Sequence, residues 1–133
     1  MIRIIAGRYK GRILRLVRSP LVRPLPAKLR GSLFNILQER ITDTNFLDGF
    51  AGTGSVGLEA LSRGARRAVF IEELPLAAKT IEANIKKCGA EELALVINKE
   101  FNRAVIDLAK RKVIFDIIFL DPPYRLLADR NPL

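Results

Sequence analysis

The spacing of apolar residues divides the first 41 positions into three parts. Short apolar runs at 2–7 and 11–17 flank a turn bounded by glycines, which is typical of a β-hairpin. A linker punctuated by prolines follows at 19–26. Over 27–41 the apolar residues recur every three or four positions, which predicts an amphipathic helix. The chain is therefore expected to begin with a hairpin, a linker and a helix.

From residue 45 onward, strand and helix patterns alternate. Strands are predicted at 45–50, 67–71, 93–97 and 115–120, and helices at 55–63, 75–87 and 102–111. Strands joined by helices pair in parallel through right-handed crossovers. The expected fold is a single Rossmann-like α/β domain over 1–133, with a parallel sheet covered by helices on both faces. Residues 1–25 would form the basic hairpin and linker, and 26–133 the helix and sheet core.

Positive charge is concentrated in the N-terminal segment. Residues 1–40 hold ten Lys or Arg and one acid, whereas 41–133 hold thirteen of each, so the whole net charge of +9 lies in the first 40 positions. Such clustering favours contact with phosphates, although a solvated basic arm without a partner is the alternative interpretation. The candidate RNA contacts are Arg3, Arg8, Lys10, Arg12 and Arg23.

The residue inventory excludes several kinds of site. The chain has no histidine and one cysteine, Cys88, so it can form no intrachain disulfide, no Cys/His metal site and no histidine general base. Its apolar runs are strand-sized and interrupted, and its N-terminus lacks the apolar stretch of a signal peptide. We expect a cytoplasmic protein that binds neither a metal nor a membrane.

A glycine-rich segment follows the first strand of the predicted sheet. It contains a G-x-G-x-x-G pattern at Gly52, Gly54 and Gly57, and Glu72 lies twenty residues after the first of these glycines. Glycines here let a ligand approach the backbone, and an acid at this distance can accept a hydrogen bond from a ribose. An NAD-binding domain and a methyltransferase both fit, and a tight turn without a ligand is the third possibility.

Two acidic features favour the methyltransferase. Asp48 precedes the glycines, where its charge would repel a pyrophosphate but attract a sulfonium cofactor. The sequence Asp121-Pro122-Pro123-Tyr124 closes the fourth strand, at the edge where open α/β sheets bind ligands. Asp121 and the Pro122 carbonyl could orient the amine of a base, the two prolines could hold the turn rigid, and Tyr124 could stack on a flipped base. These four residues are the predicted catalytic set.

Together these motifs resemble the bacterial small-subunit ribosomal RNA guanine-N2 methyltransferase family, the RsmD family. The similarity includes the opening IRIIAGRYKGRIL, RPLPAKLRGSLFNIL at 23–37, FAGTGSVGLEALSRGA at 50–65, FIE at 70–72 and DPPY at 121–124. It implies methyl transfer from S-adenosylmethionine to the N2 amine of a guanine in ribosomal RNA, on naked RNA or on a small ribosomal subunit particle. The implied cofactor contacts are Asp48, Phe50, Gly52, Gly54, Glu72 and Glu100, the last standing where the family usually has an aspartate.

The sequence stops nine residues after Tyr124, whereas the RsmD family continues with further strands, including an antiparallel hairpin. The strand at 115–120 is therefore expected to lie at an open edge of the sheet. The chain could be a fragment, a second chain could complete the sheet, or the protein could be a remnant. The functional alternatives are an adenine-N6 methyltransferase, an inactive RNA-binding remnant and an NAD oxidoreductase.

Overall fold

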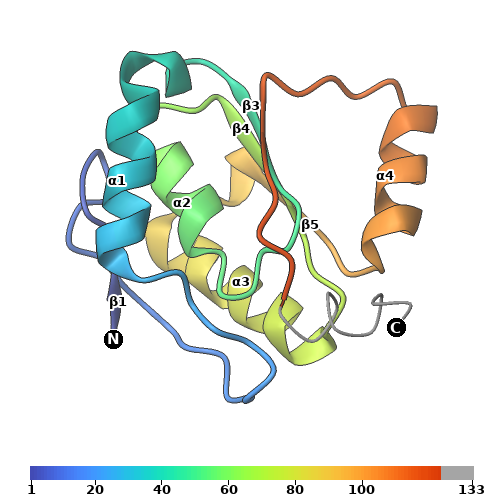
Figure 1. Ribbon diagram of the computed structural model, residues 1–133, viewed down its shortest axis with the longest axis horizontal. Coiled ribbons are helices and arrows are strands. Elements are labelled where there is room, and N and C mark those ends of the chain that lie inside the picture. Colours follow the sequence, from blue (N-terminus) through green and yellow to red (C-terminus); the bar gives the residue numbers. More distant parts are fainter. Residues whose placement is uncertain (124–133) are drawn as a thin grey trace, which may run out of the picture.

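The computed structural model describes residues 1–123 and contains a parallel sheet between helical layers (Figure 1). The sheet has the strand order β5-β4-β3-β6, and all three neighbouring pairs are parallel. Its strands are β3 (Asn45–Asp48), β4 (Arg67–Ile71), β5 (Ala94–Ile97) and β6 (Ile117–Phe119). The predicted Rossmann-like α/β sheet is confirmed.

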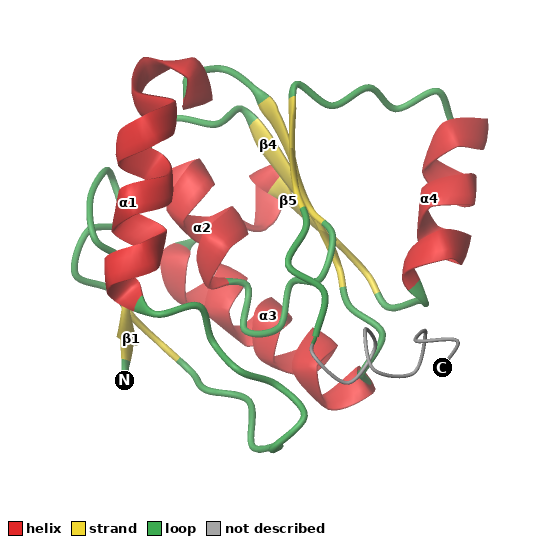
Figure 2. Cartoon of the chain, in the orientation of Figure 1, coloured by secondary structure: helices red, strands yellow, loops and turns green. Residues whose placement is uncertain are grey.

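Helices cover both faces of this sheet, as predicted (Figure 2). On one face lie α1 (Ala27–Leu37), α2 (Ser55–Ser62) and α3 (Pro75–Cys88), and on the other lies α4 (Phe101–Lys110). Two short 3-10 helices, η1 (Gln38–Ile41) and η2 (Glu91–Leu93), precede β3 and β5. The helix predicted over 27–41 is divided because Gln38 takes a φ of +47°, which ends the α-helical geometry. No helix in the described part of the chain is long and apolar enough to cross a membrane.

The N-terminal hairpin is shorter than its sequence pattern predicted. Its strands β1 (Ile2–Arg3) and β2 (Ile13–Leu14) pair through two residues each, instead of over 2–7 and 11–17. Backbone amides beyond these paired residues donate hydrogen bonds to side chains on two helices. Ile5 and Ala6 donate to the carboxylate of Glu59 in α2, and Arg15 donates to the Asn84 side chain in α3. The hairpin is therefore attached to the helical layer.

Glu59 is the centre of a buried polar cluster that joins the hairpin, α1 and α2. Its fully buried carboxylate forms ion pairs with Arg30, at 3.3 Å, and with Arg63, at 2.8 Å. The Arg30 guanidinium also donates to the carbonyl oxygen of Arg3. Arg30 is only 1% exposed, so one of the ten basic residues counted in the N-terminal segment has its charge neutralised inside the protein.

Two apolar clusters pack on opposite faces of the sheet, and they are unequal in size. The larger one joins the hairpin, α1, α2, α3 and one face of the strands, whereas the smaller one lies under α4 and includes Leu47 and Leu108. Within residues 1–123, β6 pairs only with β3, so the predicted open edge is present. Ile118 and Leu120 are 56% and 51% exposed beside this edge.

Candidate functional site

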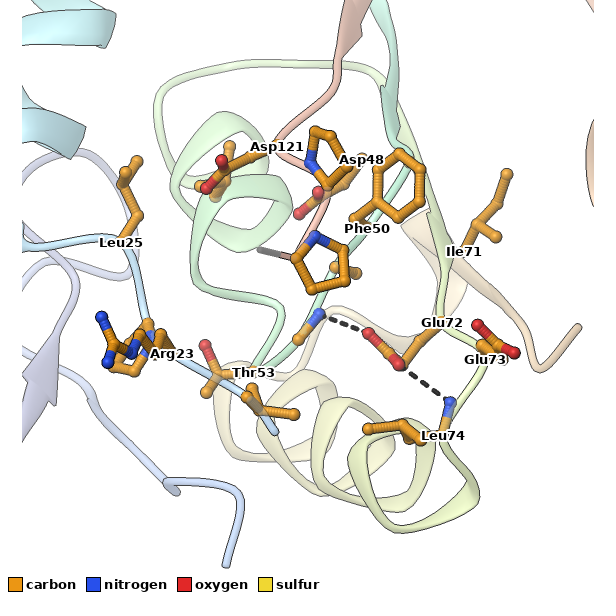
Figure 3. Close-up of a pocket in the computed structure, with 18 of the residues that line it drawn as sticks. Arg23, Leu25, Asp48, Phe50, Thr53, Ile71, Glu72, Glu73, Leu74 and Asp121 are labelled. Atoms are coloured by element: carbon orange, nitrogen blue, oxygen red, sulfur yellow. Dashed lines mark hydrogen bonds between the residues drawn. The ribbon is translucent and has the colours of Figure 1, made fainter. Parts of the chain in front are cut away.

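A cavity of about 810 Å³ lies at the carboxyl ends of β3, β4 and β6 (Figure 3). Its walls come from the linker stretch 20–26, the loop after β3 with the start of α2, the turn after β4, the start of α4 and the segment after β6. Among the predicted site residues it brings together Asp48, Phe50, Gly52, Glu72, Glu100, Asp121, Pro122 and Pro123. Tyr124 lies outside the described residues. Residues distant in the chain thus meet at the ligand-binding edge of the sheet.

The glycine loop after β3 has two left-handed residues with different surroundings. Gly52 lines the cavity with a φ of +57°, and its amide donates to Glu72 at 2.8 Å. Gly54, with a φ of +83°, is not among the lining residues, and a Cβ there would lie 3.1 Å from Ile81 in α3. Gly54 is therefore required by the turn and by packing against α3, and its contact with a ligand stays a prediction.

Asp48 ends β3 beneath the glycine loop and is 1% exposed. The pKa of its carboxyl group is raised to about 7, mainly by burial and in smaller part by the negative charges of Glu72 and Asp121. A hydrogen bond from the Gly57 amide, at 3.1 Å, opposes this rise. The Asp48 carboxyl group thus accepts the hydrogen bond of an amide in the first turn of α2, which a dinucleotide phosphate would otherwise accept. This disfavours the NAD hypothesis.

Glu72 is fixed at the end of β4 by hydrogen bonds to both carboxylate oxygens. One oxygen accepts from the Gly52 amide and the other, at 2.9 Å, from the Leu74 amide (Figure 3). Each carboxylate oxygen can accept more than one hydrogen bond, so Glu72 keeps capacity for a ligand hydroxyl. Its position connects the glycine loop to the turn before α3.

An aromatic pair forms another part of the cavity wall. Phe50 stacks on Phe101, with ring centroids 4.7 Å apart and an interplanar angle of 18°. Glu100 lies beside them and caps α4, since its side chain accepts a hydrogen bond from the Asn102 amide at 2.8 Å. Sequence reasoning missed Phe101, because only the fold brings the start of α4 against the loop after β3.

The cavity is acidic, although the chain as a whole is basic. Its lining includes the carboxylates of Asp48, Glu72, Glu73, Glu100 and Asp121. The cations in the lining are Arg23 and Lys99, and Lys99 forms an ion pair with Asp107. An excess of carboxylates in a partly enclosed site favours a cationic ligand. Within the described residues, no group of three or more potential metal ligands has the geometry to hold a metal ion.

The predicted RNA contacts separate into two places. Arg3, Arg8, Lys10 and Arg12 are exposed on or beside the hairpin, where Arg8 lies over the Tyr9 ring at 5.5 Å. The Arg12 guanidinium donates to a carbonyl oxygen at the end of α3. Arg23 instead lies on the cavity wall, within a stretch of the linker, 20–26, that sequence reasoning did not assign to the site.

Comparison with known proteins identifies the family. The family described as Conserved hypothetical protein 95 matches residues 2–130. The chain belongs to this family. This member of the Conserved hypothetical protein 95 family is 40% identical, over 124 residues, to the ribosomal RNA small subunit methyltransferase D of Escherichia coli. That match covers 93% of this chain and 61% of the relative, and it confirms the resemblance to the RsmD family.

Solved structures agree with this family assignment. A hypothetical protein of Thermus thermophilus is 33% identical, with a TM-score of 0.83 over 98% of this chain and 79% of that one. The O-methyltransferase of Bacillus cereus in complex with SAH is 18% identical, with a TM-score of 0.67 over 74% of this chain and 46% of that one, and shares the fold alone. This Conserved hypothetical protein 95 family member spans 61 to 67% of the length of three curated relatives.

Proposed function

We propose that this chain transfers a methyl group from S-adenosylmethionine to the exocyclic N2 amine of a guanine in small-subunit ribosomal RNA. The observation that carries the proposal is the acidic cavity in which Asp121, Pro122 and Pro123 lie with Asp48 at the carboxyl ends of β6 and β3. Its support from comparison is the name of the Escherichia coli relative, a ribosomal RNA small subunit methyltransferase.

The cavity fits S-adenosylmethionine in size and in charge. About 810 Å³ lies within the range of small-molecule sites. Asp48 supplies negative charge for the cationic amino-acid end, Glu72 can accept from the ribose hydroxyls, and Phe50 with Phe101 offers an apolar wall to the adenine. Glu100 stands beside that wall as a further acceptor. When bound, the cofactor supplies an electrophilic methyl group.

The residues after β6 would position the base. The Asp121 carboxylate and the Pro122 carbonyl oxygen can each accept a hydrogen bond from an exocyclic amine, which directs the nitrogen lone pair into the cavity. Pro122 and Pro123 restrict the backbone of this segment. A strong general base is not required, because the amine becomes acidic only as the new bond forms. Stacking of the base on Tyr124 remains a sequence-based prediction.

A product analysis tests this function. Small-subunit ribosomal RNA and assembled small-subunit particles are incubated with the protein and isotopically labelled S-adenosylmethionine, and the RNA is digested for nucleoside mass spectrometry. We expect labelled N2-methylguanosine. Labelled N6-methyladenosine would instead assign the adenine methyltransferase, and cofactor binding without transfer to either substrate would favour an inactive remnant.

The affinity for S-adenosylmethionine is predicted to fall as the pH is lowered through 7. The raised pKa of Asp48, about 7, leaves this carboxyl group largely protonated at pH 5.5, whereas a cationic ligand favours its ionised form. Between pH 5.5 and 7.0, where the cofactor ammonium group stays protonated, the affinity should rise about tenfold. Titration calorimetry measures this change, and Asp48→Asn should flatten it. An equally steep rise in Asp48→Asn would contradict the role of this group.

RNA affinity is predicted to depend on the exposed cations of the hairpin. Reversing Arg3, Arg8 and Lys10 to glutamate should lower the slope of log affinity against log salt by about 0.7 to 0.9 for each lost phosphate contact. The matched control reverses Arg103, Lys110 and Arg111, which are also exposed but lie in or next to α4, on the opposite face of the sheet (Figure 1). Equal effects of the two triple variants, both shown to be folded by circular dichroism, would mean that the hairpin has no special role.

A further inference from the structure

The linker between the hairpin and α1 passes over the glycine loop. A Cβ placed on Gly52 would lie 3.3 Å from Cγ1 of Val22, so these two segments are in close contact. Arg23 is the next residue and lines the same cavity. Figure 3 shows its side chain at the edge of the cavity opposite Glu72, with Thr53 between the two. A residue from the basic N-terminal segment therefore lies in the proposed cofactor site.

The charge on Arg23 is available to a ligand. Its side chain is exposed, and within residues 1–123 it forms no hydrogen bond or ion pair. Lys99, the other lining cation, is held by Asp107. Arg23 is thus the lining cation that the rest of the described chain leaves unneutralised, in a cavity otherwise rich in carboxylates.

We propose that Arg23 binds the α-carboxylate of S-adenosylmethionine; this inference rests on the function proposed above. The sulfonium and ammonium groups of that ligand suit the acidic lining, but its carboxylate would be repelled by the same residues. A guanidinium can donate two parallel hydrogen bonds to a carboxylate, which compensates this repulsion.

The positions of the other groups set the direction of the ligand. Phe50, Phe101 and Glu72 suit the nucleoside end of the cofactor, and Asp48 suits the cationic groups. Figure 3 shows Arg23 and Glu72 on opposite sides of the cavity, so with the nucleoside at Glu72 the amino-acid end would extend toward Arg23. The sequence predicted that Arg23 contacts RNA. Its position in the cavity lining favours a contact with the cofactor instead.

The test compares two ligands that differ in the carboxylate alone. Titration calorimetry measures the affinities of S-adenosylmethionine and decarboxylated S-adenosylmethionine for the wild type, Arg23→Gln and Arg23→Lys. The wild type should prefer the carboxylated ligand about tenfold, Arg23→Gln should lose most of that preference, and Arg23→Lys should retain part of it. Arg18→Gln is the matched control, since Arg18 is an exposed cation that precedes the lining stretch of the linker.

Three other results of these measurements would overturn the role of Arg23. A folded Arg23→Gln protein that keeps the wild-type preference overturns the inference, while the proposed function stands if S-adenosylmethionine still binds. Weaker RNA binding with that preference unchanged would assign Arg23 to an RNA phosphate and overturn the inference as well. A wild type that binds neither ligand would overturn the proposed function, and the inference with it.

Discussion

Asp121→Ala is expected to abolish methyl transfer while leaving the affinity for S-adenosylmethionine within about threefold of the wild type. The carboxylate of Asp121 lines the cavity next to the segment Pro122–Pro123, where it can hold the amine of the base. Loss of this alignment should lower the rate about a thousandfold, which corresponds to about 4 kcal/mol in the activation barrier. Single-turnover transfer of a labelled methyl group measures the rate, and calorimetry measures the affinity.

Two further variants make this result specific. Asp121→Asn keeps one acceptor oxygen and should retain part of the activity, whereas Glu92→Ala changes an exposed acid outside the cavity lining and should react as the wild type does. Full activity in Asp121→Ala would show that this residue does not position the amine. A matching loss of cofactor affinity would instead place Asp121 in the cofactor site.

Glu59→Ala is expected to lower the free energy of unfolding by about 3–5 kcal/mol, because it leaves a buried charge without its partner. Arg30 would lose its ion pair while remaining buried, and the amides of Ile5 and Ala6 would lose their acceptors. Urea unfolding followed by circular dichroism measures the change. This loss would also release the start of the hairpin from α2.

The exposed Glu82 in α3 provides the control, since its replacement by alanine should change the free energy of unfolding by less than about 0.5 kcal/mol. Should Glu59→Ala be too unstable to purify, Glu59→Gln still tests the idea, because it keeps the shape of the side chain but removes the charge. A loss below about 1 kcal/mol in both Glu59 variants would contradict a central role for this cluster.

Most of the fold over residues 45–119 could be predicted from the sequence, because the apolar periodicity of each strand and helix matches the face that it buries in the core. Alternating strand and helix patterns predicted every strand and α-helix of the sheet domain to within a few residues. The predicted hairpin is longer than the observed one. The amides of Ile5 and Arg15, beyond the two paired residues of each strand, donate to the Glu59 and Asn84 side chains, more than 50 positions away, and not to the opposite strand. Such contacts leave no periodic signal in the hairpin itself.

The candidate site was predicted less completely than the fold. Motifs at strand ends pointed to Asp48, Glu72 and Asp121, because the carboxyl ends of neighbouring parallel strands converge. The linker stretch 20–26 and Phe101 could not be predicted in this way, since neither lies at the carboxyl end of a predicted strand. The role of Gly54 could not be decided from the sequence, because a left-handed glycine in a loop is required equally by a ligand or by a helix packed behind it.

The affinity of the wild-type chain for S-adenosylmethionine tests the central claim most directly. Titration calorimetry at pH 7.0 should show saturable binding of one ligand per chain, and Asp48→Asn should weaken it because the buried carboxylate that attracts the cation is removed. The same titration with NAD should give no heat beyond dilution. Saturable binding of NAD, or no binding of S-adenosylmethionine to a folded chain, would contradict the assignment of this cavity.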